Sequence, residues 1–428
     1  MSVRNTVKPK DKALNSVLRD SGSALGVHSV HPTCEADTGM IRSVKIAGYR
    51  GLRKFSMEGL RRINLLVGKN NTGKSSVLEA LYLLSTSGSP ATIWQLLMRR
   101  GEIYTEPQLP GRSYQPETEV RHLFYGHEIK IGSTLSVGTY NGSPNREITI
   151  QIGEVSSDPN FALFSQLTPP ADRGLAPQFG LTIKGNPTPT SQAIPLTPRG
   201  NLRQDVMQTV LNVSIGRHAG NPVIGLPGDN ATSRYVTAES LAISEVQAEY
   251  SEIALTPREE PVIRALRFIQ SDIERLAISQ GPFFPGAGWP VRGGLKVKLK
   301  DTDEPVPIGS LGEGIWRMLA LAISLSKAQG GILLMDEIDT GLHFSVMEKM
   351  WRFVADAARE LDIQIFATTH SLDCVRSLAA FCDDVPTVGE DVSIQRIESD
   401  TETAITYSPA EIRALARAAR TQVEIEVR

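Results

Sequence analysis

The 428-residue sequence has little cysteine, no long apolar run and no strong charge of either sign. Its three cysteines are odd in number and lack C-x-x-C spacing, which argues against a disulfide framework and predicts a reducing, cytoplasmic setting. The formal charge of -2 excludes a basic field over the whole molecule, so any contact with nucleic acid must come from a local patch. No apolar run reaches the roughly 18 residues of a membrane-spanning helix, so we expect no contact with a membrane.

The hydrophobic content of 40% is enough for one large core or several ordinary domains. Composition then divides the chain into four segments. Residues 1–39 mix charged and small residues without periodicity, which predicts a disordered extension, and residues 40–85 begin a folded domain. Residues 86–255 are rich in Pro, Gly and Thr around alternating stretches, which predicts a β-rich middle lobe or insertion. Residues 256–428 are predicted to form a helical lobe and the second part of the folded domain, with one helix expected over 258–279.

A glycine-rich loop follows the apolar run Ile63–Val67 and precedes a helix-like pattern. It fits G-x-x-x-x-G-K-[ST], the phosphate-binding P-loop, although a glycine-rich turn without a ligand is the structural alternative. Lys74 is expected to reach the β- and γ-phosphates of a nucleotide, and Ser75 to bind Mg²⁺. The residues assigned to the nucleotide here are Gly68, Asn70, Asn71, Thr72, Gly73, Lys74, Ser75 and Ser76.

A second apolar run, Ile332–Met335, ends in two carboxylates. Asp336 and Glu337 would lie at the carboxyl edge of a parallel sheet, where ligands bind in α/β folds. Asp336 is the expected Mg²⁺ ligand and Glu337 the expected general base. A strand that runs into a helix N-cap would give the same pattern without catalysis.

Two shorter patterns flank these carboxylates. The turn Ser310–Gly314 opens a helix with apolar residues at helical spacing, and it is either an anion site or an ordinary capping turn. The stretch Thr368–Ser371 ends an apolar strand, which places His370 at the same sheet edge as Asp336. A single histidine is often structural, but this one is positioned to sense a γ-phosphate.

The order of P-loop, "SLGEG", "ILLMDE", "DTGLH" and "TTHS" resembles the ABC-type ATPase heads of the SMC, RecF and OLD (overcoming lysogenization defect) group. It is most similar to stand-alone OLD-like bacterial ATPases of the AAA type. The resemblance implies an α/β P-loop NTPase of the ABC-ATPase head type with a β-rich middle insertion, using ATP and Mg²⁺. Two heads of this group dimerise around two ATP molecules, and the signature turn of one head caps the γ-phosphate bound by the other.

The resemblance also assigns roles to single residues. It makes His370 the catalytic switch histidine, and it gives no identifiable glutamine-loop residue beyond the candidates Gln115 and His122. Further assignments are the signature residues Ser310, Gly312 and Gly314, the post-carboxylate loop residues Asp339 and His343 at the dimer interface, and Arg50 as a basic residue near the nucleotide.

The sequence departs from this group in two respects. Only 58 residues follow His370, without a spaced Glu and Asp-x-Asp set, so we expect no Toprim nuclease in this chain. The segment between P-loop and signature lacks extended heptads, so we expect no coiled-coil arm.

The function implied is an ATP-hydrolysing head that dimerises and controls a separately encoded effector, such as a Toprim-like nuclease or a toxin, in defence against phage. One alternative is a RecF-like DNA-binding ATPase in repair, with a basic face from residues such as Arg99, Arg100, Arg112 and Arg121. Another alternative is a nucleotide-gated scaffold with negligible turnover.

Overall fold

A computed structural model describes most of the chain after Met40. The described residues are 39–104, 117–143, 145–154, 179–186, 191–207, 233–239, 241, 243–278, 294–399 and 401–426, without the side chains of 191–192 and 419–426. The predicted disordered extension therefore lies outside the described residues, apart from Gly39.

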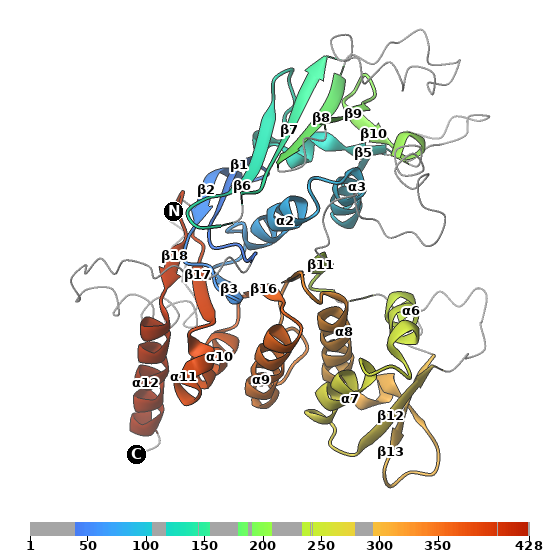
Figure 1. The fold of residues 1–428 in the computed structure, drawn as a ribbon, viewed down its shortest axis with the longest axis vertical. Helices are drawn as coiled ribbons and strands as arrows, with labels where there is room; N and C mark the ends of the chain where they lie inside the picture. Colours follow the sequence, from blue (N-terminus) through green and yellow to red (C-terminus); the bar gives the residue numbers. More distant parts are fainter. Residues whose placement is uncertain are drawn as a thin grey trace, which may run out of the picture.

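A six-stranded, mostly parallel sheet forms the centre of the fold (Figure 1). Its order is β11 (Ser233–Val236), β15 (Ile332–Met335), β16 (Gln364–Thr369), β3 (Ile63–Val67), β17 (Val392–Arg396) and β18 (Ile405–Tyr407), with only β18 antiparallel. Every residue of β3, β15 and β16 is buried, as expected for parallel strands covered on both faces. Alternate residues of these strands enter two different cores, so Leu65 faces one and Leu66 the other.

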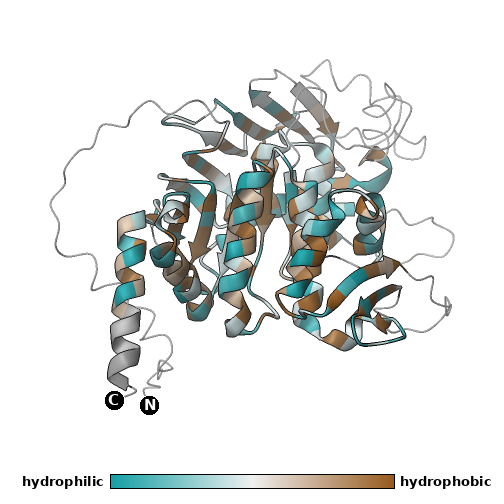
Figure 2. Cartoon of the chain, turned by 60° about the horizontal axis from the view of Figure 1, so that its bottom comes forward, coloured by the Kyte–Doolittle hydropathy of each residue, from teal (hydrophilic) through white to brown (hydrophobic). Residues whose placement is uncertain are grey.

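Helices from the second half of the chain cover one face of this sheet. They are α8 (Glu313–Lys327), α9 (Phe344–Glu360), α10 (Leu372–Asp384), α11 (Pro386–Gly389) and α12 (Pro409–Glu426). Figure 1 shows α12, α10, α9 and α8 as a row below the sheet. Helices α9 and α10 are amphipathic, with their polar sides turned outward (Figure 2), whereas α8 is buried on all sides from Ile315 to Ser326. No helix in the described ranges is long and apolar enough to cross a membrane.

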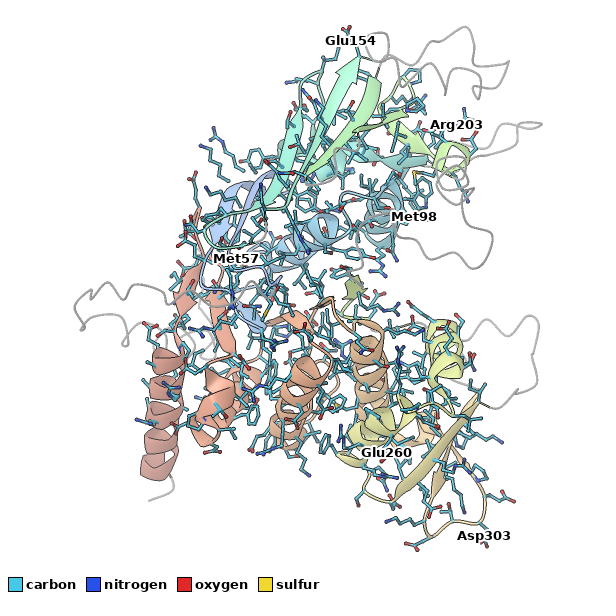
Figure 3. The ribbon with its side chains drawn as sticks, viewed as in Figure 1. Met57, Met98, Glu154, Arg203, Glu260 and Asp303 are labelled. Atoms are coloured by element: carbon cyan, nitrogen blue, oxygen red, sulfur yellow. The ribbon has the colours of Figure 1, made fainter. Side chains whose placement is uncertain are left out.

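An antiparallel sheet and two helices cover the opposite face. The helices are α2 (Lys74–Ser85) and α3 (Pro90–Arg99), and the sheet order is β2 (Leu52–Met57), β1 (Val44–Tyr49), β6 (Thr134–Thr139), β7 (Glu147–Glu154), β8 (Phe179–Asn186) and β9 (Ser191–Pro195). Side chains fill the space between this sheet and α2, and β7 extends outward to Glu154 (Figure 3). A small sheet of β10 (Asn201–Arg203), β5 (Glu117–Glu119) and β4 (Ile103–Tyr104) lies beside it, together with the 3₁₀ turns η1 (Val120–Leu123) and η2 (Tyr125–His127).

The described part of residues 86–255 contains many strands, and several of them pair with strands from other parts of the chain. Strand β6 pairs with β1, so β6–β9 extend the sheet that residues 44–57 begin. Strand β11, also from the middle region, instead joins the central parallel sheet beside β15. The sequence could not show this because both pairings join residues far apart in the chain.

A smaller unit lies beside α8. It consists of α6 (Ile243–Ile253), α7 (Glu259–Arg267), β12 (Ile273–Ile278), β13 (Leu295–Leu299), β14 (Val306–Pro307) and the 3₁₀ turn η5 (Ile308–Leu311). Glu260 on α7 and Asp303, between β13 and β14, mark its outer end in Figure 3.

The prediction of one helix over 258–279 is wrong in its second half. Helix α7 ends at Arg267, and Ile273 begins β12, which pairs with β13. The register shifts between Ile273 and Arg275, and this irregularity lets Ile273 and Leu276 both face the core. Their spacing of three therefore imitated a helical repeat.

Candidate active site

Four parallel strands end at one edge of the central sheet. The P-loop follows β3, His370 follows β16, Asp336 and Glu337 follow β15, and Thr237 follows β11. Since β16 lies between β3 and β15, the structure brings the P-loop, the two carboxylates and His370 to the same edge. This is the arrangement expected from the order of the motifs.

The P-loop adopts a backbone that its glycines permit. Gly68 and Gly73 have φ of 153° and 96°, and Asn71 has φ of 63°. A Cβ atom on Gly68 would lie 2.3 Å from the carbonyl oxygen of Ile397, so no larger residue fits there without a shift of the backbone. The Thr72 hydroxyl donates to the Lys69 carbonyl at 3.0 Å, and Asn70 and Asn71 are exposed.

Lys74 folds back over the loop that it follows. Its Nζ donates to the carbonyl oxygens of Gly68 at 2.9 Å and Lys69 at 2.7 Å. Burial lowers the pKa of Lys74, while the nearby charges of Asp336 and Glu337 oppose that shift. An ammonium held in this way by neutral carbonyls can exchange them for phosphate oxygens, which are stronger partners.

Thr368 connects the two carboxylate residues. Its hydroxyl donates to the Asp336 carboxylate and accepts from the backbone N–H of Glu337 at 2.8 Å. Glu337 has φ of 48°, and its carboxylate oxygens accept from the Thr340 hydroxyl at 2.9 Å and lie 3.4 Å from His370 Nδ1. Glu337 and His370 therefore face each other at the exposed end of the site.

Asp339 turns into the protein. It is 8% exposed and accepts a hydrogen bond of 2.7 Å from the Thr369 hydroxyl. His343, in contrast, is exposed at the start of α9 and caps that helix by accepting from the Ser345 backbone N–H. Nucleotide binding by Asp339 stays a prediction, and the contacts described give it a role in holding the loop.

Arg50 lies in a buried ion-pair network. It is 4% exposed, with Nε 2.6 Å from Glu79 and Nη1 2.5 Å from Glu102. Glu79 is on α2, one turn after Ser75, and also accepts from the Tyr49 hydroxyl at 2.9 Å. Contact of Arg50 with a nucleotide stays a prediction, because the structure places its guanidinium against carboxylates.

The signature turn is exposed at the start of α8. Ser310 and Gly312 are exposed, and Gly312 has φ of 94°. The turn packs on the loop after the carboxylates, since a Cβ atom on Gly314 would lie 3.3 Å from the Gly341 carbonyl oxygen. Ser310 and Gly312 thus present an open surface beside this loop.

Arg317 is a site residue that the sequence reasoning missed. It is 2% exposed on α8, one turn after the signature, and its Nη2 donates to the backbone carbonyl oxygens of Asp336 at 2.9 Å and Glu337 at 2.5 Å. Its Nη1 donates to the Thr237 and Ala238 carbonyls at 3.3 and 3.4 Å. Burial lowers the pKa of Arg317, against the pull of the surrounding carboxylates. The sequence does contain a signal for this residue, because Arg317 is an arginine inside the apolar run "IWRMLALAISL".

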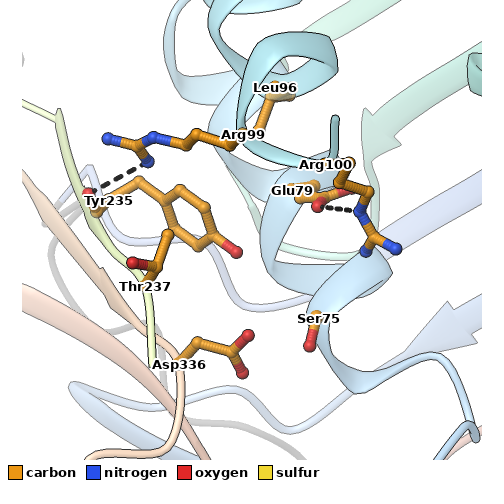
Figure 4. A pocket seen from close by; sticks show the side chains of 8 residues that line it. All are labelled: Ser75, Glu79, Leu96, Arg99, Arg100, Tyr235, Thr237 and Asp336. Carbon is orange, nitrogen blue, oxygen red and sulfur yellow. Dashed lines mark hydrogen bonds and ion pairs between the residues drawn. The ribbon is translucent and has the colours of Figure 1, made fainter. Parts of the chain in front are cut away.

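A pocket of about 300 Å³ opens beside the predicted metal ligands (Figure 4). It is lined by Ser75, Glu79, Leu96, Arg99, Arg100, Tyr235, Thr237 and Asp336, and by none of residues 310–314. Of the glutamine-loop candidates, Gln115 lies outside the described residues. His122 is not part of this lining and has its Nε2 3.1 Å from Glu119.

The donor set at this pocket fits Mg²⁺. Ser75 and Asp336 supply a hydroxyl and a carboxylate, the hard oxygen ligands that this ion prefers. In the described part of the chain, no group of three or more His, Cys, Asp or Glu residues could hold a metal ion by itself. That fits an ion that takes its remaining ligands from phosphates and water.

Two protein families match successive parts of the chain. Residues 40–211 match a family described as "AAA ATPase domain". Residues 262–374 match a family described as "AAA domain, putative AbiEii toxin, Type IV TA system". The first match contains the P-loop, and the second contains the signature turn, the two carboxylates and His370. Both matches are to ATPase families, and the predicted α/β P-loop NTPase fold is confirmed.

Individual proteins show more distant similarity. An "ATP/GTP phosphatase" of Helicobacter pylori is 26% identical over 353 residues, 79% of this chain and 87% of that protein. The DNA replication and repair protein RecF of Clostridioides difficile is 38% identical over 45 residues, 10% of this chain and 12% of that protein. Among solved structures, the SMC head domain from Thermotoga maritima is 11% identical with a TM-score of 0.41, covering 86% of this chain and 98% of that chain.

Proposed function

We propose that this chain hydrolyses ATP and uses the cycle of binding and hydrolysis to control a partner. The observation that carries the proposal is the meeting of Lys74, Ser75, Asp336, Glu337 and His370 at one sheet edge. The match to ATPase families and the similarity to an ATP/GTP phosphatase support it.

Each of these residues has a distinct task in the proposed reaction. Lys74 and the P-loop N–H groups hold the phosphates, and Ser75 and Asp336 would hold Mg²⁺, which supplies charge to the phosphoryl oxygens. Glu337 accepts the proton of the attacking water. His370, 3.4 Å from Glu337, orients that carboxylate and contacts the γ-phosphate.

The second copy of this chain completes the proposed site. Residues 310–314 do not line the pocket of their own chain, and Ser310 and Gly312 are exposed. In the proposed homodimer, Ser310, Gly312 and Gly314 of one copy cap the γ-phosphate held by the other, as in the OLD-like heads that the motif order resembles. ATP thereby joins the two subunits.

The proposed partner is a separately encoded effector, such as a Toprim-like nuclease or a toxin, acting in defence against phage in the cytoplasm. Support comes from the matched family whose description includes "putative AbiEii toxin, Type IV TA system". A RecF-like role in DNA repair is the second candidate, favoured by the short similarity to RecF. Its predicted basic face is not supported, because Arg99 and Arg100 line the pocket, Arg121 pairs with Glu119, and Arg112 lies outside the described residues.

ATP turnover by the purified chain, with and without double-stranded DNA, tests this proposal. We expect hydrolysis that DNA does not stimulate, and loss of hydrolysis in Lys74→Ala with the fold retained, because the Lys74 ammonium donates to loop carbonyls rather than packing in a core. Stimulation by DNA would favour the RecF-like role. Negligible turnover in both conditions would favour a nucleotide-gated scaffold, and unchanged turnover in Lys74→Ala would remove this P-loop from the mechanism.

A further inference from the structure

The pocket extends beyond the two predicted metal ligands. Its other half is formed by Arg99 and Arg100 at the end of α3, by Tyr235 on β11, and by Glu79 on α2 (Figure 4). None of these four residues has a task in the proposed hydrolysis. Their chemistry indicates what the remaining space can hold.

Both arginines are positioned by contacts that use only part of their donor capacity. Arg99 donates from Nη1 to the Tyr235 carbonyl at 3.4 Å, with its guanidinium 5.3 Å from the Tyr235 ring centroid. Arg100 places Nε 2.6 Å from Glu79, and its side chain is 37% exposed. A guanidinium has five N–H donors, so each arginine retains donors for a ligand in the pocket.

The Tyr235 hydroxyl points into the pocket. The residue is 5% exposed, yet this hydroxyl makes no hydrogen bond to any of the residues that the structure describes. The hydroxyl is open to the pocket, so it can donate to a ligand bound there. Stacking on Tyr82, with centroids 5.6 Å apart, fixes the ring. A tyrosine hydroxyl keeps its proton at neutral pH, so it remains a donor.

The two carboxylates that line the pocket, Glu79 and Asp336, do not neutralise the positive charge of the arginines. Glu79 is already paired with the buried Arg50 at 2.6 Å, so Arg100 is a second cation on the same carboxylate. Asp336 is the predicted Mg²⁺ ligand. With Mg²⁺ bound, the pocket offers positive charge and hydroxyl donors, which suits a small anion rich in acceptor oxygens.

We propose that this half of the pocket binds inorganic phosphate, holding the hydrolysis product beside Ser75 and Asp336 before its release. The proposal rests on the proposed function for the origin of the phosphate, but the binding site itself is defined by Arg99, Arg100 and Tyr235. In the proposed dimer, the partner copy's signature turn closes the site from outside. The pocket would hold the released phosphate on the chain whose P-loop bound the ATP.

Equilibrium dialysis of the full chain with radiolabelled orthophosphate, in the presence of ADP and Mg²⁺, tests this proposal. We expect Arg100→Gln to weaken orthophosphate binding about tenfold, because a charged donor is lost. Tyr235→Phe keeps the ring and its stacking while removing the hydroxyl, and should weaken binding several-fold. The matched control is Arg121→Gln, an exposed arginine outside the pocket, which should leave binding unchanged.

The affinity for ADP separates this site from the nucleotide site. We expect it to stay within about twofold in Tyr235→Phe, since a local hydroxyl deletion perturbs little else. The proposal is contradicted if wild-type protein binds no orthophosphate at millimolar concentration. It is also contradicted if neither pocket variant weakens binding, or if ADP affinity falls in parallel. Orthophosphate binding that is sensitive to these variants, in a chain that hydrolyses no ATP, would overturn the proposed function and leave the site intact.

Discussion

At the scale of single residues, the site depends on side chains that hold the reactive groups as much as on those groups themselves. Thr368 has the clearest role of this kind, because one hydroxyl fixes both the Asp336 carboxylate and the Glu337 backbone. Glu337 needs such support, since its φ of 48° is unusual for a residue with a Cβ atom. A threonine is suited to the position because a hydroxyl both donates and accepts.

Replacement of Thr368 by the isosteric valine should therefore impair catalysis. We expect kcat for ATP to fall at least about tenfold, because both carboxylate residues lose their shared anchor, and the free energy of unfolding to fall by about 1 to 3 kcal/mol. Steady-state kinetics and urea denaturation measure the two effects. Thr401→Val, at an exposed position, is the control, and a Thr368→Val enzyme with wild-type kcat would show that the hydroxyl does not position the site.

The sequence predicted those site residues whose types and spacing are set by chemistry. The P-loop, Asp336-Glu337 and His370 follow apolar runs, and the structure places them at the ends of β3, β15 and β16. Arg50 shows the limit, because its partners Glu79 and Glu102 come from distant parts of the chain and only the fold brings them together. Tyr235 was missed for a similar reason: β11 has four residues, too few for a periodic pattern.

At the scale of elements, helix α8 joins the signature turn to the catalytic edge of the sheet. Its Arg317 donates to the carbonyls of Thr237 and Asp336, which directly follow β11 and β15, two strands that lie side by side in the sheet. A movement of the signature turn against a second subunit would act on Asp336 and Glu337 through this side chain. Arg317 is thus a positioning residue between the two parts of the proposed dimeric site.

Arg317→Met should destabilise the protein and slow hydrolysis. The substitution keeps most of the side-chain volume but leaves several buried carbonyl oxygens without a donor, so we expect the free energy of unfolding to fall by about 2 to 4 kcal/mol. We also expect kcat to fall at least about tenfold, because the chain segments that follow β15 and β11 are then no longer held in position. Arg317→Lys, which keeps the charge but has fewer donors, should be intermediate in both measurements. Equal stability and equal kcat in Arg317→Met would refute the coupling role.

At the scale of the whole molecule, the two matched families occupy the two halves of one active site. Residues 40–211 contribute the P-loop and the antiparallel sheet, and residues 262–374 contribute the signature turn, the carboxylates and His370. The parallel pairing of β3 with β16 joins the two regions within one sheet. In the proposed dimer, the exposed signature turn acts on the pocket of the second copy, since it does not line the pocket of its own chain.

The most direct test is sedimentation velocity of Glu337→Gln with and without ATP and Mg²⁺. This variant should bind ATP and hydrolyse it at least about a hundredfold more slowly, so that the loaded state accumulates. We predict that ATP converts the protein into a dimer, and that adding Ser310→Arg to the same chain abolishes the conversion. Ser310 suits this purpose because it is exposed, whereas a side chain at Gly312 would be strained at φ of 94°. An unchanged sedimentation coefficient on addition of ATP to Glu337→Gln would contradict the account of two heads joined by nucleotide.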